Sequence, residues 1–187
     1  MKKISILLVV LAFVAVSSVP GFAGKSIKVN ADALGKLQLP VPESDDAKRY
    51  LGLKKGGSFT LPQIKADVLI IEMFSMYCPI CQSEAENINK LYKMINDNPK
   101  LRRGVRVIGI GINNTPFEVN VFRKKYTVPF PLVPDPDFLS KRISRQQLRT
   151  PTFIVARVKD GKGLKVIRTH VGPIDNLGEF LKGLWRK

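Results

Sequence analysis

The sequence has few metal-binding side chains: its 187 residues include two cysteines and one histidine. A structural zinc site needs about four cysteine or histidine ligands, and this chain offers only Cys78, Cys81 and His170. The shortage disfavours zinc, and we expect neither a metal nor an organic cofactor. After Val16, no apolar run approaches the roughly 20 residues that a membrane-spanning helix needs. The sequence also lacks internal repeats and low-complexity tracts.

The N-terminus has the pattern of a secretory signal peptide. Lys2 and Lys3 precede the apolar run Ile4–Val16, and small residues at Gly21 and Ala23 fit a cleavage site. We therefore expect export and cleavage after Ala23, with an uncleaved membrane anchor as the alternative. Because no cysteine follows the signal, a lipid anchor is not expected.

Acidic residues are scarce: 15 acidic residues stand against 31 basic ones, and the formal net charge is +16. In an exported protein this charge favours anionic membrane surfaces or acidic partner proteins, and we expect no nucleic-acid partner. The basic residues are scattered, however, so a merely solvated surface is the simplest interpretation. Examples are Lys54-Lys55, Arg102-Arg103, Lys124-Lys125 and Lys141-Arg142.

Both cysteines lie in Cys78-Pro79-Ile80-Cys81, where a strand-like run gives way to a helical pattern. The run Val68–Ile71, prolonged by Met73-Phe74, is typical of a buried strand. From Ile80 onward, apolar residues recur at helical spacing until Asp97-Asn98-Pro99 gives a stop signal. The pattern therefore predicts that Cys78 lies at a helix N-terminus.

A helix N-terminus changes the chemistry of a thiol. Its unpaired N–H groups and positive dipole end stabilise a thiolate, and the second thiol one turn on can donate a hydrogen bond to it. A thiol of pKa ~8.5 is only ~3% ionised at pH 7, whereas one of pKa ~7 is half ionised. A permanent structural disulfide is the alternative, but so short a loop restrains the unfolded chain very little. The spacing favours a redox-active dithiol, which in an oxidising compartment needs a partner that resets it.

The rest of the chain predicts a single α/β domain. Val105–Ile110 resembles a second buried strand, and Thr115-Pro116-Phe117-Glu118 supplies a helix start that leads to about Tyr126. Thr152–Val158 and Leu164–Thr169 flank a turn, which indicates a hairpin. The order predicts a central mixed sheet flanked by helices.

Three shorter features complete this prediction. Phe130–Val133 is an extended piece, and Phe138–Ile143 is a short helix. Apolar residues from Ile174 to Trp185 form the stripe of a closing amphipathic helix. We divide the chain into a signal peptide at 1–23, an N-terminal extension at 24–57 that packs on the domain and can open a helix at Ser44-Asp45, and the domain itself at 58–187.

The dithiol and its surroundings resemble the thioredoxin-like redoxins. Phe74–Glu84, together with Thr150-Pro151-Thr152-Phe153 well downstream, is similar to the exported thiol–disulfide oxidoreductases of the TlpA/ResA type. The similarity runs from about Ser58 to the C-terminus and includes the extra segment Asn113–Leu139 that redoxins carry. It implies a thioredoxin fold with a redoxin-type insertion, and it is weak evidence for the substrate.

The resemblance also implies roles for individual residues. Cys78 would be the attacking thiol and Cys81 the resolving one, so that their disulfide is the redox centre. Pro151 would be a cis-proline beside the dithiol, and Thr150 would offer its backbone to the substrate. Tyr77 replaces the usual tryptophan. With Thr150 and the dipeptide Pro79-Ile80, it would form the surface that meets the substrate.

Two acids match the family pattern. Glu72 stands six residues before Cys78, where thioredoxin has a buried acid, and such a carboxyl would have a raised pKa and take the proton of Cys81. The alternative is that Glu72 is partly solvated or neutralised by a lysine. Glu84 matches an acid of the exported subgroup and could modulate the site, or it is an ordinary helix-surface residue.

The sequence departs from the family in ways that leave the redox potential open. Glu86 replaces the proline that kinks the active-site helix in many relatives. The Pro79-Ile80 dipeptide is neither the Gly-Pro nor the Pro-His that the family associates with reducing and oxidising members.

Three functions remain after this comparison. The first is exchange or reduction of protein disulfides, in cytochrome c maturation or general thiol repair, with a membrane or exported redox partner that recycles the dithiol. The second is peroxide reduction, which is weakened because Ile71 and Ser75 occupy the positions of the proline and threonine that peroxiredoxins use. The third, a copper chaperone of thioredoxin fold, would need one more residue between the cysteines.

Overall fold

The computed structural model describes residues 26–54, 56–159 and 162–184. The predicted signal peptide at 1–23 lies outside these residues. Within them, no helix has both the length and the apolar character needed to cross a membrane.

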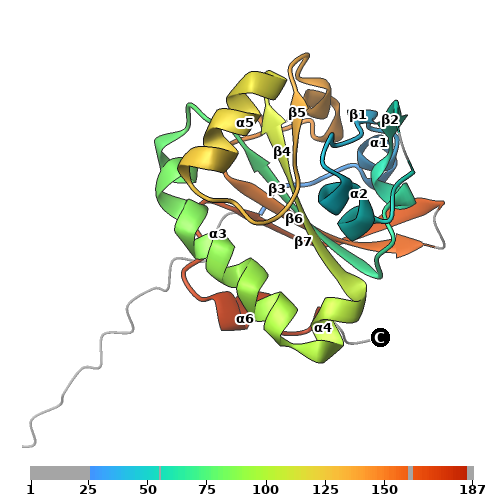
Figure 1. Ribbon diagram of the computed structural model, residues 1–187, viewed down its shortest axis with the longest axis vertical. Coiled ribbons are helices and arrows are strands. Elements are labelled where there is room, and N and C mark those ends of the chain that lie inside the picture. The colour runs from blue at the N-terminus through green and yellow to red at the C-terminus, as the bar shows by residue number, and fades with distance from the viewer. Residues whose placement is uncertain (1–25, 55, 160–161, 185–187) are drawn as a thin grey trace, which may run out of the picture.

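A five-stranded mixed sheet, in the order β5-β4-β3-β6-β7, forms the centre of the fold (Figure 1). Strands β3 (Val68–Phe74), β4 (Val105–Ile112) and β5 (Leu132–Asp135) are mutually parallel. Strand β6 (Thr152–Lys159) is antiparallel to β3 and forms the predicted hairpin with β7 (Gly163–Val171). The predicted mixed sheet flanked by helices is confirmed.

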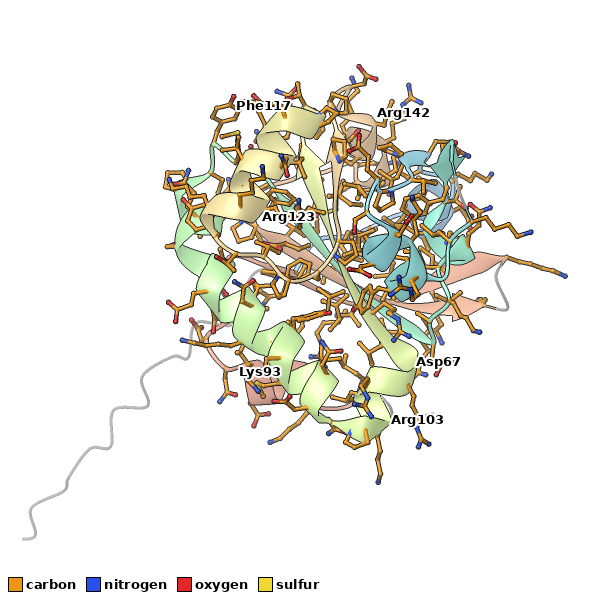
Figure 2. All side chains as sticks on the ribbon, viewed as in Figure 1. Asp67, Lys93, Arg103, Phe117, Arg123 and Arg142 are labelled. Atoms are coloured by element: carbon orange, nitrogen blue, oxygen red, sulfur yellow. The ribbon has the colours of Figure 1, made fainter. Side chains whose placement is uncertain are left out.

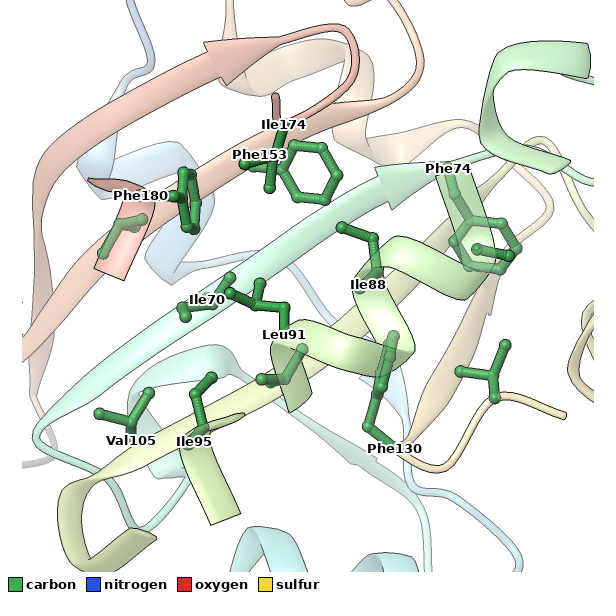
Figure 3. Close-up of a cluster of buried hydrophobic side chains, with 14 of the residues drawn as sticks. Ile70, Phe74, Ile88, Leu91, Ile95, Val105, Phe130, Phe153, Ile174 and Phe180 are labelled. Atoms are coloured by element: carbon green, nitrogen blue, oxygen red, sulfur yellow. The ribbon is translucent and has the colours of Figure 1, made fainter. Parts of the chain in front are cut away.

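Side chains of β3 alternate between two apolar cores. Val68, Ile70 and Phe74 enter the first core, whereas neighbouring residues enter the second. The first core is covered by four helices, and Figure 3 shows part of it between α3 and the sheet. These helices are α3 Pro79–Asp97, α4 Pro99–Gly104, α5 Pro116–Lys125 and α6 Leu177–Leu181.

The second core is covered by the N-terminal segment and two short 3-10 helices. Their bounds are α1 Ala31–Gly35, β1 Leu39–Pro40, α2 Asp45–Leu51, β2 Ser58–Phe59, η1 Leu61–Gln63 and η2 Leu139–Ile143. Leu34, Leu39 and Leu51 are almost completely buried there, and each such leucine contributes about 1.5–3 kcal/mol. Residues 26–59 therefore complete the core of the domain, and β1 pairs with β2 across the junction.

The helix starts follow from local chemistry. The Ser44 side chain accepts a hydrogen bond from the backbone of α2, as expected of an N-cap. At the start of α5, Thr115 and Glu118 form the predicted capping box. Three basic residues in the last turn of α5 face the negative end of its dipole.

Two predicted helix ends differ from the structure. The stop at Asp97-Asn98-Pro99 is also the start of α4, because the Asn98 side chain caps that helix. The closing helix is only Leu177–Leu181. Ile174 lies buried before it, Gly183 with φ 78° follows it, and Trp185 lies outside the described residues.

Candidate active site

The two cysteines lie at the junction of β3 and α3. Cys78 is the N-cap of α3, as predicted, and Pro79 occupies the first helical turn. Both cysteines are free thiols; Cys78 is half-buried and Cys81 is fully buried. The backbone N–H of Cys81 donates to Sγ of Cys78 over 3.3 Å. The first turn of α3 thus directs a hydrogen-bond donor at the sulfur of Cys78 and buries the sulfur of Cys81.

The surroundings of the two thiols give them opposite acidities. Partial burial of Cys78 opposes ionisation, but interactions with the side chains of Thr150 and Cys81 and with the backbone N–H of Cys81 outweigh it and lower the pKa of Cys78. Burial, followed by the hydrogen bond with Cys78, raises the pKa of Cys81 far above its ordinary value. Cys78 is therefore the thiol that ionises first and that a large reactant can reach.

The loop before β6 lies directly beside the dithiol. The Thr150–Pro151 peptide bond is cis, and the Cys78 thiol donates to the Thr150 carbonyl oxygen over 3.3 Å. The Thr152 hydroxyl donates to the Arg149 carbonyl over 2.5 Å, which fixes the loop on its other side. The structure thus brings together the two segments that the sequence resemblance singled out.

Glu72 lies on the face of β3 that supports α3, between Ile70 and Phe74. Only 3% of its surface is exposed, and within the described residues its Oε1 atom has no hydrogen-bond partner. Burial raises the pKa of Glu72 from 4.5 to about 8, and the nearby charge of Glu84 adds to the shift. The alternative that Glu72 is partly solvated or neutralised by a lysine is therefore wrong.

Glu84 is also buried, so the alternative of an ordinary helix-surface residue is wrong. Its Oε1 atom accepts hydrogen bonds from the Ile174 backbone N–H and the Asn87 side chain, each over 2.8 Å. Asn87 also donates to the Ile174 carbonyl over 2.9 Å. Sequence reasoning missed this role because Ile174 is far away in the chain. Glu84 thus ties the active-site helix to the segment before α6.

Replacing Glu84 with alanine should lower the free energy of unfolding by about 2–3 kcal/mol. The substitution removes charge-assisted hydrogen bonds and leaves the Ile174 N–H buried without a partner. Urea denaturation would measure the change. Glu86→Ala is the matched control, because Glu86 lies on the same helix in an exposed ion pair with Lys90 and should cost less than about 1 kcal/mol. Equal losses in both variants would contradict this role for Glu84.

The segment before Cys78 is held by two residues that sequence reasoning did not assign to the site. The buried Asn114 accepts a hydrogen bond from the Met76 backbone over 2.8 Å. Glu118 accepts one from the Tyr77 hydroxyl, which raises the pKa of Tyr77 and lowers that of Glu118. Glu118 was recognisable only as the acid of a capping box. The α5 helix therefore positions the residues that precede the dithiol.

An exposed apolar surface surrounds Cys78. Tyr77 is 66% exposed and Ile80 is 46% exposed, and Pro79 between them is also exposed. A cavity of about 630 Å³ lies between α2, α5 and residues 128–134, and neither cysteine lines it. The dithiol thus faces a surface that suits a protein chain rather than an enclosed small-molecule pocket.

The described residues hold no group of three or more His, Cys, Asp or Glu side chains arranged to bind a metal. The histidine considered in the sequence, His170, hydrogen-bonds through Nε2 to the Pro173 carbonyl over 2.6 Å and packs near Phe153 and Phe180.

Comparisons with known proteins agree with this geometry. Over 81 residues the chain is 27% identical to the thiol-disulfide oxidoreductase ResA of Halalkalibacterium halodurans. That alignment covers 43% of each chain, so the protein spans less than half the length of this curated relative.

Solved structures share the fold. The thioredoxin domain of a thiol-disulfide oxidoreductase from Bacteroides vulgatus has a TM-score of 0.59 and 16% identity, covering 85% of this chain and 99% of that one. A secreted disulfide oxidoreductase from Mycobacterium tuberculosis has a TM-score of 0.52 and 17% identity, with coverages of 79% and 92%. The predicted thioredoxin fold is confirmed. Residues 42–146, more than half of the chain and including both cysteines, match one family, and the protein therefore belongs to the AhpC/TSA family.

Proposed function

We propose that the protein is an exported thiol–disulfide oxidoreductase that reduces or exchanges disulfides in other proteins. The observation that carries this proposal is the placement of the two thiols at the start of α3: Sγ of the half-buried Cys78 accepts a hydrogen bond from the Cys81 N–H, and Cys81 itself is fully buried. Cys78 is accessible and has a lowered pKa, whereas Cys81 is buried and has a raised one. A nucleophile and a protected resolving thiol need this difference.

The reaction follows two exchanges. The Cys78 thiolate attacks one sulfur of the substrate disulfide, which forms a mixed disulfide and releases the other sulfur as a thiolate. Cys81 then loses its proton, attacks Sγ of Cys78 and releases the second substrate sulfur. The substrate gains two electrons and two protons, and Cys78 and Cys81 end as a disulfide. No cofactor beyond the dithiol is needed in this scheme.

Glu72 would accept the proton of Cys81 in the second exchange. A carboxyl with a pKa of about 8 is a far stronger base than an ordinary one. Two observations support this role: Glu72 lies on the α3 face of β3, and it interacts electrostatically with Glu84, which is one turn beyond Cys81 in α3.

Protein substrates fit the exposed surface formed by Tyr77, Pro79 and Ile80. Export is supported by the predicted signal peptide and by the likeness to a secreted disulfide oxidoreductase. A membrane or exported dithiol would have to reduce the Cys78–Cys81 disulfide after each turnover. We place the protein in cytochrome c maturation or general thiol repair, two processes that consume such reducing equivalents.

A comparison of two substrates tests this function against peroxide reduction. The reduced protein should reduce insulin disulfides readily but hydrogen peroxide only slowly, because fully buried Ile71 and half-buried Ser75 replace the residues that activate a peroxidatic thiol. Insulin turbidity and a coupled peroxide assay would measure the two rates, with Cys78→Ser as the inactive control. Rapid peroxide turnover with slow insulin reduction would favour the peroxidase instead.

A further inference from the structure

The segment Lys141–Arg149, which we name the basic arm, concentrates positive charge in the stretch of chain that leads to Thr150 beside the dithiol. Its four basic residues are all exposed, and no acidic residue lies between Asp137 and Asp160. The residues are Lys141, Arg142, Arg145 and Arg149.

The fold holds the basic arm in place. Asp135 is buried and its carboxylate accepts hydrogen bonds from the backbone N–H groups of Leu139 and Ser140, over 2.8 and 2.9 Å. Ile143 is fully buried, and its carbonyl accepts a hydrogen bond from Asn30 over 2.7 Å. The apolar side of the arm is thus anchored in the second core, while the cations remain in solvent.

The arm ends at the nucleophile. Arg149 immediately precedes Thr150, whose carbonyl oxygen accepts the hydrogen bond from the Cys78 thiol. A partner whose disulfide reaches Cys78 must therefore come close to this end of the arm.

Five cations elsewhere in the described part of the protein are held in ion pairs. Lys48, Arg49, Lys90, Lys93 and Lys182 form ion pairs with acids of their own helices. Lys141 and Arg142 lie in the last turn of η2, near the negative end of that short helix. Arg145 and Arg149 lie outside the helices, and across the described part of the chain neither is in an ion pair. Their charges are available to a partner.

We propose that the basic arm docks acidic protein partners of the dithiol, which present carboxylates beside the disulfide to be exchanged. This inference rests on the proposed function and specifies its partner class. An anionic membrane is the competing occupant of a basic surface. It fits less well, because a membrane lying against Arg149 would also cover Cys78 and obstruct the approach of a protein disulfide.

The protein offers a matched control for the arm. Arg102 and Arg103 are two exposed arginines of α4, and Figure 2 shows Arg103 at the opposite end of the molecule from Arg142. Arg145→Glu with Arg149→Glu, and Arg102→Glu with Arg103→Glu, therefore change the net charge equally at different places.

The experiment uses two synthetic peptides that contain the same intramolecular disulfide, one flanked by glutamates and the other by lysines. Stopped-flow kinetics would give the second-order rate constant for their reduction by the reduced protein. At ~0.01 M ionic strength the glutamate peptide should react about tenfold faster than the lysine peptide, and the preference should fade at ~1 M. The Arg145/Arg149 double variant should lose the preference, and the Arg102/Arg103 double variant should keep most of it.

Other results would overturn the proposal in distinguishable ways. Equal rates for both peptides, or equal loss of preference in both double variants, would show that the arm has no specific role while the proposed function stands. Failure to reduce either peptide would remove the proposed function and the arm with it. If the Arg145/Arg149 variant keeps the peptide preference but loses sedimentation with phosphatidylglycerol vesicles, the arm is a membrane surface.

Discussion

Replacing Cys81 with serine should trap exported proteins as mixed disulfides with Cys78. Attack by Cys78 does not need the second thiol, whereas release of the substrate does, so this variant stops halfway through the reaction. Cys78→Ser should trap at least about tenfold less, because Cys81 is fully buried and the pKa of its thiol is raised. Non-reducing gels after acid quenching and alkylation, followed by mass spectrometry, would count the trapped species.

Cys81→Ser and Cys78→Ser are matched controls, because each replaces one thiol at the start of the same helix. A variant lacking both cysteines sets the background. Equal trapping by the two single variants would mean that Cys81 attacks as readily as Cys78, and the assignment of nucleophile and resolving thiol would be wrong.

The sequence predicted those features of the site that depend on local order. The change of period at Cys78 placed this cysteine at a helix start, and the apolar runs of β3 and β4 identified the parallel pair at the centre of the sheet. The resemblance to redoxins added Pro151, because no local pattern connects that loop with Cys78. These predictions needed only neighbouring residues or a known motif.

The features that the sequence could not supply depend on contacts between distant segments. From the sequence, Glu84 is either a modulator of the site or an ordinary acid on the surface of α3, and only its hydrogen bond with the Ile174 backbone shows why it is buried. Glu118 takes part in the capping box of its own helix and also accepts a hydrogen bond from the Tyr77 hydroxyl. This second contact depends on the packing of α5 beside the dithiol. The cations of the basic arm were visible in the sequence, but the contacts of Asp135 and Ile143 that anchor the arm were not.

Glu72→Gln should slow resolution of the mixed disulfide by about 10²-fold near neutral pH, with little effect on attack by Cys78. Removing a positioned base has an effect of this size. Because the pKa of Glu72 is about 8, its carboxylate form grows as pH rises. Resolution in the wild-type protein should accelerate up to about pH 8, and the variant should lose this inflection. Stopped-flow measurement of both steps from pH 6 to 9 tests the proposal, and wild-type resolution rates in the variant would contradict it.

The same substitution should stabilise the fold, in a manner that depends on pH. The pKa of Glu72 is about 8 in the folded protein against 4.5 ordinarily, so between these values the folded state binds more protons than the unfolded state. Wild-type stability therefore falls as pH rises from 4.5 to about 8. Glutamine does not titrate, so the variant should gain little near pH 4 and roughly 1–4 kcal/mol above pH 8. Urea denaturation across this range, with Glu86→Gln as the exposed control, would measure it. A stability difference that does not change with pH would show that Glu72 titrates normally and cannot be the buried proton acceptor of Cys81.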